Sequence, residues 1–200
     1  VSNVTASVVG MLYNFQLLRL AGQNGVAAFG VLMYVEFIFA AVFIGYAIGC
    51  APIISFHYGA GNKDELKNLL KISVRLMAGG GVVLTALALL LARPLAAVFV
   101  GYDAALFDLT CHAFGVFSFA FLFAGFNIFA SSFFTALNNG GVSAAISFLR
   151  TLVFQSASVI LLPLLFDVDG IWYAIPAAEV FATLISAMFL FLKQKKYGYM

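Results

Sequence analysis

Long apolar runs are the feature of this sequence that most narrows its possible folds. From Phe114 to Leu137 no residue is charged, and most are hydrophobic or small. A helix needs about 20 such residues to cross roughly 30 Å of hydrocarbon. The whole chain is 64% hydrophobic and 9% charged, whereas about 25% of the residues of a soluble domain are charged. The sequence therefore predicts an integral membrane protein.

Helices explain these runs better than the strands of a β-barrel. Barrel strands alternate polar and apolar residues over about 10 positions, and the run from Phe114 to Leu137 does not. Helices also satisfy their own backbone hydrogen bonds in lipid. Between two of the spans, Pro94 is expected to open a short separate helix, because Asp103 and Asp108 argue against a further crossing. We predict an all-α integral membrane fold with six transmembrane helices, over residues 4–20, 26–56, 69–91, 112–137, 142–165 and 171–192.

The start of the chain suggests that it belongs to a longer protein. The first residue is Val1, and the first apolar segment begins almost at once, with no basic region of the kind that opens a signal peptide. We therefore expect further segments of the same protein to precede it.

The cations give the six helices an orientation. Lys and Arg accumulate on the cytoplasmic side of membrane proteins, and with alternating loops only Arg19 and Arg93 fall on the opposite side. The turn at residues 167–170 on that side carries two aspartates, and Trp172 is expected in the interface beside it. The second loop, the fourth loop and the C-terminus are therefore predicted to be cytoplasmic, from Lys63, Lys67, Lys71, Arg75, Arg150, Lys193, Lys195 and Lys196.

Three ionisable side chains are expected at membrane depth, where such groups are rare and point to function. Glu36 and Glu179 lie about 12 to 15 Å from the outer side, at 1.5 Å per helical residue. Either could exchange a proton, or simply form a hydrogen-bonded contact between helices. Arg150 could face the same interior or extend toward the headgroups. The sequence leaves these alternatives open.

The fourth predicted helix carries a small and polar stripe at helical spacing. The stripe predicts a face turned toward other helices, or toward a water-filled cavity that Asn127 would line. The phenylalanines on the other faces are expected to contact lipid. The stripe consists of Ala120, Ala124, Asn127, Ser131 and Thr135, and the phenylalanines are Phe114, Phe119, Phe121, Phe126, Phe129 and Phe133.

Signals for an enzyme are weak. His57 and His112 are expected at opposite faces of the membrane, so they cannot share a metal, and no HExxH or GxSxG pattern occurs. The GAGNK stretch at residues 59–63 is not a Walker A motif, which requires GxxxxGK[ST]. We therefore expect no catalytic residues, no metal, no cofactor and no nucleic-acid partner.

Several stretches resemble the multidrug and toxic compound extrusion (MATE) family. The run YVEFIFAAVFIGYAIGCAPIISFHYGAGNKDELKNLLK resembles the family where a helix ends at a turn and a basic amphipathic stretch follows. The run FNIFASSFFTALNNGGVSAAISFLRTLVF and the stretch DGIWYAIPAAE resemble its last three helices. These are residues 34–71, 126–154 and 169–179. The resemblance spans essentially the whole chain in order, and the MepA-like branch of bacterial exporters is the most similar.

The resemblance implies a twelve-helix transporter built of two six-helix lobes. This chain would be the C-terminal lobe, with the N-terminal lobe missing. It implies antiport across the bacterial cytoplasmic membrane, with cationic or amphipathic drugs leaving in exchange for H+ or Na+. Since acidic residues of the lobe cavities serve as the family's coupling sites, that role would fall to Glu36 and Glu179. The partners would be cationic small molecules, the bilayer and the other lobe.

The resemblance also suggests substrate contacts, and it has one departure. Asn14, Asn127, Arg150 and Gln155 would offer polar contacts in the cavity. Phe117 or Phe134, which lie nearer the polar face of the fourth predicted helix, would stack on aromatic drugs. Some branches carry acids in the first and fourth helices of this lobe, and this chain has none there. Two alternatives stay open: a flippase for lipid-linked precursors, whose cavity should be richer in cations, and a membrane scaffold that transports nothing.

Overall fold

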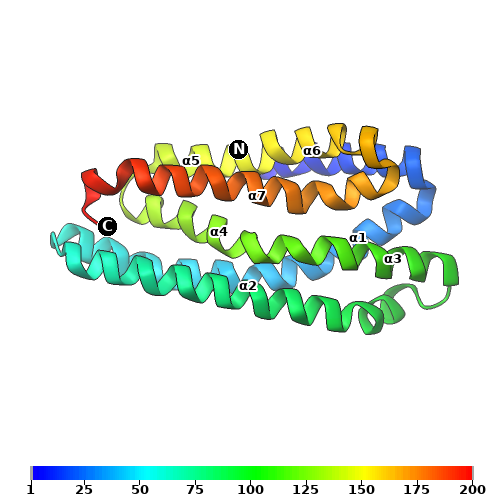
Figure 1. The fold of residues 1–200 in the computed structure, drawn as a ribbon, viewed down its shortest axis with the longest axis horizontal. Coiled ribbons are helices and arrows are strands. Elements are labelled where there is room, and N and C mark those ends of the chain that lie inside the picture. Colours follow the sequence, from blue (N-terminus) through cyan, green and yellow to red (C-terminus); the bar gives the residue numbers. More distant parts are fainter. Residues whose placement is uncertain (1, 200) are drawn as a thin grey trace.

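The computed structural model describes the backbone of residues 2–199 and the side chains of residue 5 and residues 7–199. The chain forms a bundle of long helices that run side by side (Figure 1), and the described residues include no strand. The prediction of an all-α fold is confirmed. The elements are α1 Ser2–Gly59, α2 Lys63–Val100, α3 Ala104–Phe117, the 3-10 turn η1 Ser118–Ala120, α4 Phe121–Ala136, α5 Gly140–Phe148, the π-helix η2 Leu149–Phe154, α6 Gln155–Leu161 and α7 Pro163–Tyr197.

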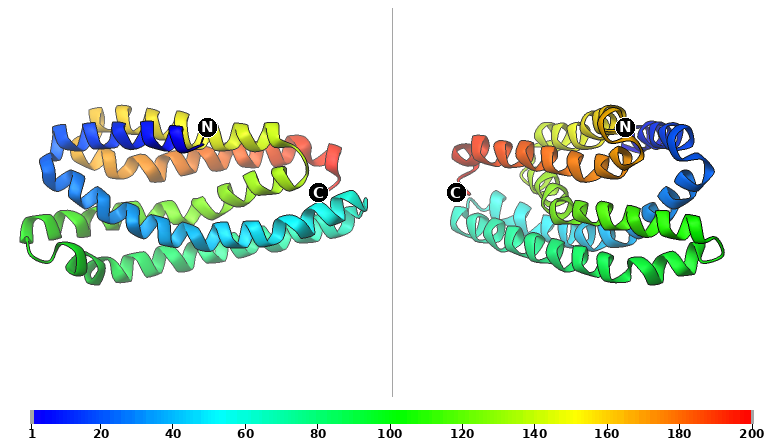
Figure 2. Two further views of the ribbon diagram at one scale, coloured as in Figure 1. Left: turned by 180° about the vertical axis from the view of Figure 1, so that it is seen from behind. Right: turned by 45° about the vertical axis from the view of Figure 1, so that its right-hand side comes forward.

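Helix α1 is two helices joined at Gly22. Its 58 residues would extend about 87 Å if straight, far more than a bilayer needs. Gly22 has φ 64° and ψ −155°, a combination open essentially to glycine alone. The chain reverses direction at this point, so the two parts of α1 run antiparallel (Figure 2). The spans predicted over 4–20 and 26–56 lie on either side of this break.

The stretch after the third predicted span differs from the expectation. Helix α2 continues through Pro94 to Val100, so no separate short helix begins at the proline, a residue that membrane helices tolerate. Asp103 instead caps α3, because its Oδ1 accepts a hydrogen bond of 3.1 Å from the Leu106 N–H. The aspartate therefore marks a turn between two long helices, and the fourth helical rod starts earlier than the predicted residue 112.

Five stretches of the described chain are long and apolar enough to cross a membrane, namely 7–59, 63–100, 104–136, 140–161 and 163–197. The first contains the Gly22 break, so it supplies two antiparallel rods and the bundle has six. The last is bent near its start, where Asp167 has a φ of 49° and a ψ of −130°. The chain is a multi-pass membrane protein.

Helix α4 occupies the centre of the bundle, between α2 on one side and α5 and α7 on the other (Figure 1). The prediction that its phenylalanines face lipid is therefore wrong for most of them. Lipid tails and protein interiors are equally apolar, so hydrophobicity alone could not distinguish the two environments. Trp172, expected in the membrane interface, is likewise 2% exposed. The buried phenylalanines of this rod include Phe114, Phe121, Phe129 and Phe133.

The second turn, the fourth turn and the C-terminus meet at one end of the molecule, which we call the basic end (Figure 1). Asn139 Nδ2 donates a hydrogen bond of 2.9 Å to the Tyr197 hydroxyl, and the rings of Tyr58 and Tyr197 lie 5.6 Å apart. The basic end carries the cations of the first turns of α2 and those of the tail, the charges from which the sequence predicted a common side.

Candidate functional site

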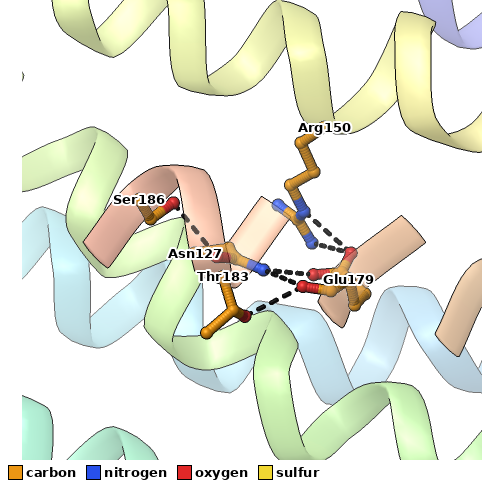
Figure 3. Close-up of polar contacts among 5 residues, drawn as sticks. All are labelled: Asn127, Arg150, Glu179, Thr183 and Ser186. Carbon is orange, nitrogen blue, oxygen red and sulfur yellow. Dashed lines mark hydrogen bonds and ion pairs between the residues drawn. The ribbon is translucent and has the colours of Figure 1, made fainter. Parts of the chain in front are cut away.

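Glu179 lies in the middle of α7 and points into the bundle (Figure 3). Its side chain is 2% exposed. Arg150 contacts the carboxylate atom Oε1 through Nε at 2.8 Å and through Nη2 at 2.7 Å. Asn127 Nδ2 donates to the other oxygen, Oε2, at 2.8 Å and also to the Glu179 main-chain carbonyl at 3.0 Å. Both carboxylate oxygens are therefore occupied.

The partners of Glu179 are themselves held in place. Ser186 Oγ donates to Asn127 Oδ1 at 3.1 Å, and Thr183 Oγ1 donates to the Glu179 carbonyl at 2.8 Å. Asn127 and Ser186 are completely buried. Buried polar groups are expensive unless they are paired, and here each polar atom of the Glu179 side chain has a partner. The cluster of Asn127, Arg150, Glu179, Thr183 and Ser186, which we call the Glu179 network, joins α4, η2 and α7.

Arg150 comes from η2, a π-helical stretch between α5 and α6. Such wider turns are rare and are frequent at functional sites. The side chain turns inward to Glu179 (Figure 3) and remains 20% exposed. The alternative in which Arg150 only extends toward the headgroups is therefore wrong: its guanidinium is the counter-ion of a carboxylate in the bundle.

A cavity of about 370 Å³ lies beside this ion pair. Its polar lining comes from Tyr13, Glu36, Arg150, Thr151 and Gln155, and the rest is apolar or glycine. Glu36, in the second part of α1, is half-buried. Among the residues that the structure describes, no hydrogen bond or ion pair reaches its carboxylate. The cavity thus contains one carboxylate without a protein partner.

The structure separates the predicted site residues into three groups. Glu36, Arg150 and Gln155 line the cavity, while Asn127 and Glu179 belong to the adjoining network. The other three lie elsewhere. Asn14 is exposed and lines a separate shallow groove, and both Phe117 and Phe134 are buried in the core.

The two phenylalanines have packing partners in place of a substrate. The ring of Phe117 lies 5.6 Å from that of Phe121, edge to face, and Phe134 lies 6.1 Å from Phe133. Neither lines the cavity, so the expectation that they stack on drugs finds no support within this lobe. Both rings are buried inside the bundle, and the helical spacing of the sequence did not reveal this.

Tyr13 is a cavity residue that the sequence reasoning missed. Its ring stacks on Phe29 at 4.9 Å and is 2% exposed, while its hydroxyl has no hydrogen-bond partner. An unpaired buried hydroxyl is costly, and this one lines the same cavity as Glu36. The sequence carried one signal for it: Tyr13 lies three residues after Gly10, so the two share one face of the helix. Gly10 also lines the cavity.

A second cavity, of about 480 Å³, meets the first at Thr151. It extends to Gly140, the first residue of α5 at the basic end. Its wall carries several hydroxyls, among them those of Thr135, Ser143 and Ser147, and Thr135 Oγ1 donates a hydrogen bond of 2.7 Å to Ser143 Oγ. The two cavities are therefore neighbours, one near the basic end and the other beside Glu36.

The arrangement favours a positively charged occupant. With both carboxylates ionised, Glu36, Glu179 and Arg150 leave one net negative charge. Arg150 and Glu179 compensate each other at 2.7 Å, so the uncompensated charge belongs to Glu36. No group of three or more His, Cys, Asp or Glu side chains that could hold a metal ion occurs in the described part of the chain.

Comparison with known proteins gave a family and a fold. The family model MatE matches residues 1–160. An outward-facing structure of a multidrug resistance MATE family transporter of the MOP superfamily has a TM-score of 0.91 at 18% identity, over 100% of this chain and 45% of that one. An inward-facing structure of such a transporter gives 0.91 at 17%, over 98% and 46%. A MATE transporter of Vibrio cholerae gives 0.89 at 17%, over 98% and 44%.

The matches to solved structures are at 17–18% sequence identity, so they show the fold of this chain alone. The chain spans a little under half the length of these solved proteins. No curated protein matches it in sequence.

Proposed function

This chain belongs to the MatE family, and we propose that it forms one lobe, the C-terminal one, of a secondary antiporter in which Glu36 is an ion-exchanging carboxylate. The transporter would export cationic or amphipathic drugs in exchange for H+ or Na+. A second lobe of the same protein would complete the cavity wall. Catalytic residues and an organic cofactor have no part in such a mechanism.

One observation carries this proposal: within the described part of the chain, Glu36 faces a cavity without a hydrogen-bond or ion-pair partner, whereas Glu179 is fully paired. A carboxylate that exchanges ions must be able to lose its partner at low cost. Glu179 would have to give up Arg150 and Asn127, and breaking a buried pair costs several kcal/mol. Glu36 has no such contacts to break among the described residues. Of the two predicted coupling residues, we assign exchange to Glu36 and a supporting role to Glu179.

The charge of the cavity bears on the type of substrate. A flippase for a lipid-linked precursor has to bind a pyrophosphate, and its cavity should carry spare cations. Among the described residues, Arg150 is the one cation that lines this cavity, and Glu179 already compensates its charge. The remaining charge is negative, which favours a proton, a sodium ion or a cationic drug. This argues for drug and cation antiport over the flippase alternative.

Exchange would couple to transport by competition. An ion and a cationic substrate would compete for the Glu36 carboxylate, and each would favour a different opening of the two lobes. The hydroxyl-lined cavity from Gly140 to Thr151 offers the ion a route to the basic end. Asn127 would act indirectly, by positioning Glu179, and Gln155 would contact the occupant.

We also propose an orientation. The basic end would face the cytoplasm of a bacterium, with the C-terminus inside, because cationic loops are retained on that side. The opposite end carries Asp103, Asp167 and Asp169 close to its turns. Cysteine introduced at Lys195 and labelled from either side of intact cells tests this: labelling from outside would contradict it.

The functional test is ion-driven drug efflux in proteoliposomes that contain the protein at its full natural length. We expect Glu36→Gln to reduce efflux driven by a proton or sodium gradient by about tenfold or more, within the range of typical coupling energies. Glu36→Asp keeps the charge and is the matched control, with most of the activity retained. Unchanged gradient-driven efflux in Glu36→Gln would refute the assignment.

A further inference from the structure

We propose that a groove at the basic end, between the first turns of α2 and the C-terminal tail, binds the headgroup of an anionic phospholipid. The groove lies at a different place in the fold from the Glu36 cavity. The inference does not depend on the transport function, because it rests on charge and shape at the membrane boundary.

The groove combines a row of cations with an apolar floor. It has a volume of about 560 Å³ and is lined by Lys67, Leu70, Lys71, Val74, Arg75 and Tyr199. The three cations are spaced four residues apart, so they lie along one face of α2 over about 12 Å. All three are exposed, while Leu70 is buried and Val74 half-buried. The groove thus offers positive charge along its length and apolar side chains beneath.

The length of α2 places the groove at the edge of the hydrocarbon. The helix has 38 residues and is therefore about 57 Å long, well beyond the roughly 30 Å of the hydrocarbon core. From Leu76 to Ala92 no residue is charged, so this part is the membrane-embedded one. Arg75 then lies at the boundary, and Lys71 and Lys67 lie successively farther out, at the level of lipid phosphates.

The C-terminal tail supplies the other wall and is firmly attached. Gly198 turns the chain back with a φ of 70°, and the tail packs so closely there that a Cβ at this glycine would lie 2.5 Å from Lys63 Cδ. Tyr199 then inserts into the bundle: its hydroxyl donates to the Leu190 carbonyl at 3.0 Å, and its ring lies 5.1 Å from that of Phe133. The wall is therefore preformed.

The charges around the groove favour a lipid with a net negative charge. None of the described residues that line it is acidic. The nearest acids along α2, Asp64 and Glu65, are in its first turn. Basic pockets at the cytoplasmic side of membrane helices attract anionic headgroups, and each Lys or Arg near the surface strengthens binding by a factor of about five. An acyl chain could contact Leu70 and Val74, which a free phosphate would leave unused. The geometry therefore points to a phospholipid.

The test uses native mass spectrometry of the detergent-purified protein at its full natural length, titrated with phosphatidylglycerol. The variant K67Q/K71Q/R75Q removes the groove's cations. The variant K193Q/K195Q/K196Q removes the same charge from the last turns of α7, at the same end of the molecule but outside the groove lining. It is the matched control. We expect the groove variant to bind phosphatidylglycerol roughly 100-fold more weakly, and the control to bind it within a few-fold of the unmodified protein.

Further measurements test which molecule occupies the groove and whether Tyr199 forms part of its wall. Phosphatidylcholine should bind far more weakly than phosphatidylglycerol, and glycerol phosphate should not compete. Tyr199→Ala, with all cations present and thermal unfolding checked, should also weaken binding. Equal losses in the two triple variants would reduce the effect to general surface attraction and overturn the proposal. Competition by glycerol phosphate at similar concentrations would overturn the lipid as occupant.

Discussion

Glu179 and Glu36 are the same side chain in two very different situations, although both lie in apolar helices and face the same part of the bundle. Glu179 is bound by Arg150 through two nitrogens and by Asn127. Glu36 lines the adjacent cavity and has no recorded partner within the described chain. Depth in the membrane therefore does not by itself make a carboxylate available for exchange. The availability of partners decides which carboxylate is structural and which can bind something else.

The difference follows from where the two helices lie. Glu179 is on α7, which packs against α4 and against η2, so donors from both elements converge on it. Glu36 is on the second part of α1 and faces a cavity that Tyr13, Arg150 and Gln155 also line, but the one cation among these described residues, Arg150, is already bonded to Glu179.

Loss of the Glu179 side chain should destabilise the lobe far more than loss of Glu36. Glu179→Ala leaves the Arg150 guanidinium without its counter-ion, and breaking such a buried pair costs about 3–5 kcal/mol. Glu36→Ala breaks no hydrogen bond or ion pair with the described residues and should cost less than about 1 kcal/mol. The free energy of unfolding in a denaturing-detergent titration measures both. Equal losses would show that Glu36 has an unrecognised partner and would break the comparison.

Asn127→Leu should produce an intermediate effect. It removes the donor to Glu179 Oε2 and to the Glu179 carbonyl, and leaving buried acceptors unpaired costs about 1–3 kcal/mol. Ser186→Ala removes only the hydroxyl that donates to Asn127 and should cost about 1 kcal/mol. The same unfolding titration ranks the two. A larger loss for Ser186→Ala would mean that Asn127 does not organise the network.

Removing the counter-ion should turn Glu179 into a second available carboxylate. In Glu36→Gln gradient-driven efflux is expected to be low, and adding Arg150→Gln should restore it about fivefold, because Glu179 then lacks the cation that occupies Oε1. Arg150→Lys in the same background keeps a cation and is the control, with no recovery. If both double variants remain inactive, Glu179 cannot take over exchange even without its counter-ion.

Tyr13→Phe should have the smallest effect on stability. The Tyr13 hydroxyl is buried without a partner, so its removal should leave stability unchanged or raise it by up to about 1 kcal/mol. Tyr46→Phe is the control, since the Tyr46 hydroxyl lies 2.9 Å from Ser73 Oγ, and it should cost about 1 kcal/mol. Similar losses in the two variants would show that the Tyr13 hydroxyl is bonded after all.

Part of the site could be read from the sequence because membrane-embedded charges are so rare. Glu36, Arg150 and Glu179 stood out, and they do lie around one region. Asn127 stood out as the polar member of a stripe and is hydrogen-bonded to Glu179. What failed was the choice between neighbouring positions on a helix: Asn14 was selected where Tyr13 lines the cavity.

The structure places the two phenylalanines expected to contact substrate away from the cavity for a related reason. Phe117 and Phe134 were placed near the polar face of their helix, and both are buried against other phenylalanines. Small rotations of a helix move a side chain from a cavity to a packed interface, and apolar residues carry no mark of which environment they occupy. The position of α4 at the centre of the bundle decided the matter.

Local features of the amino-acid sequence were enough to predict a bundle of membrane helices, roughly where each helix ends, which end is basic and which few ionisable groups lie inside. These features are the length of apolar runs, the turn residues and the distribution of Lys and Arg. The pairing of Glu179, and the lack of a partner for Glu36 among the described residues, depend on how the helices pack, because Glu179's partners lie 29 and 52 residues away along the chain. Hydrophobicity specifies that a helix is buried, but the side chains it meets depend on the packing of all the others.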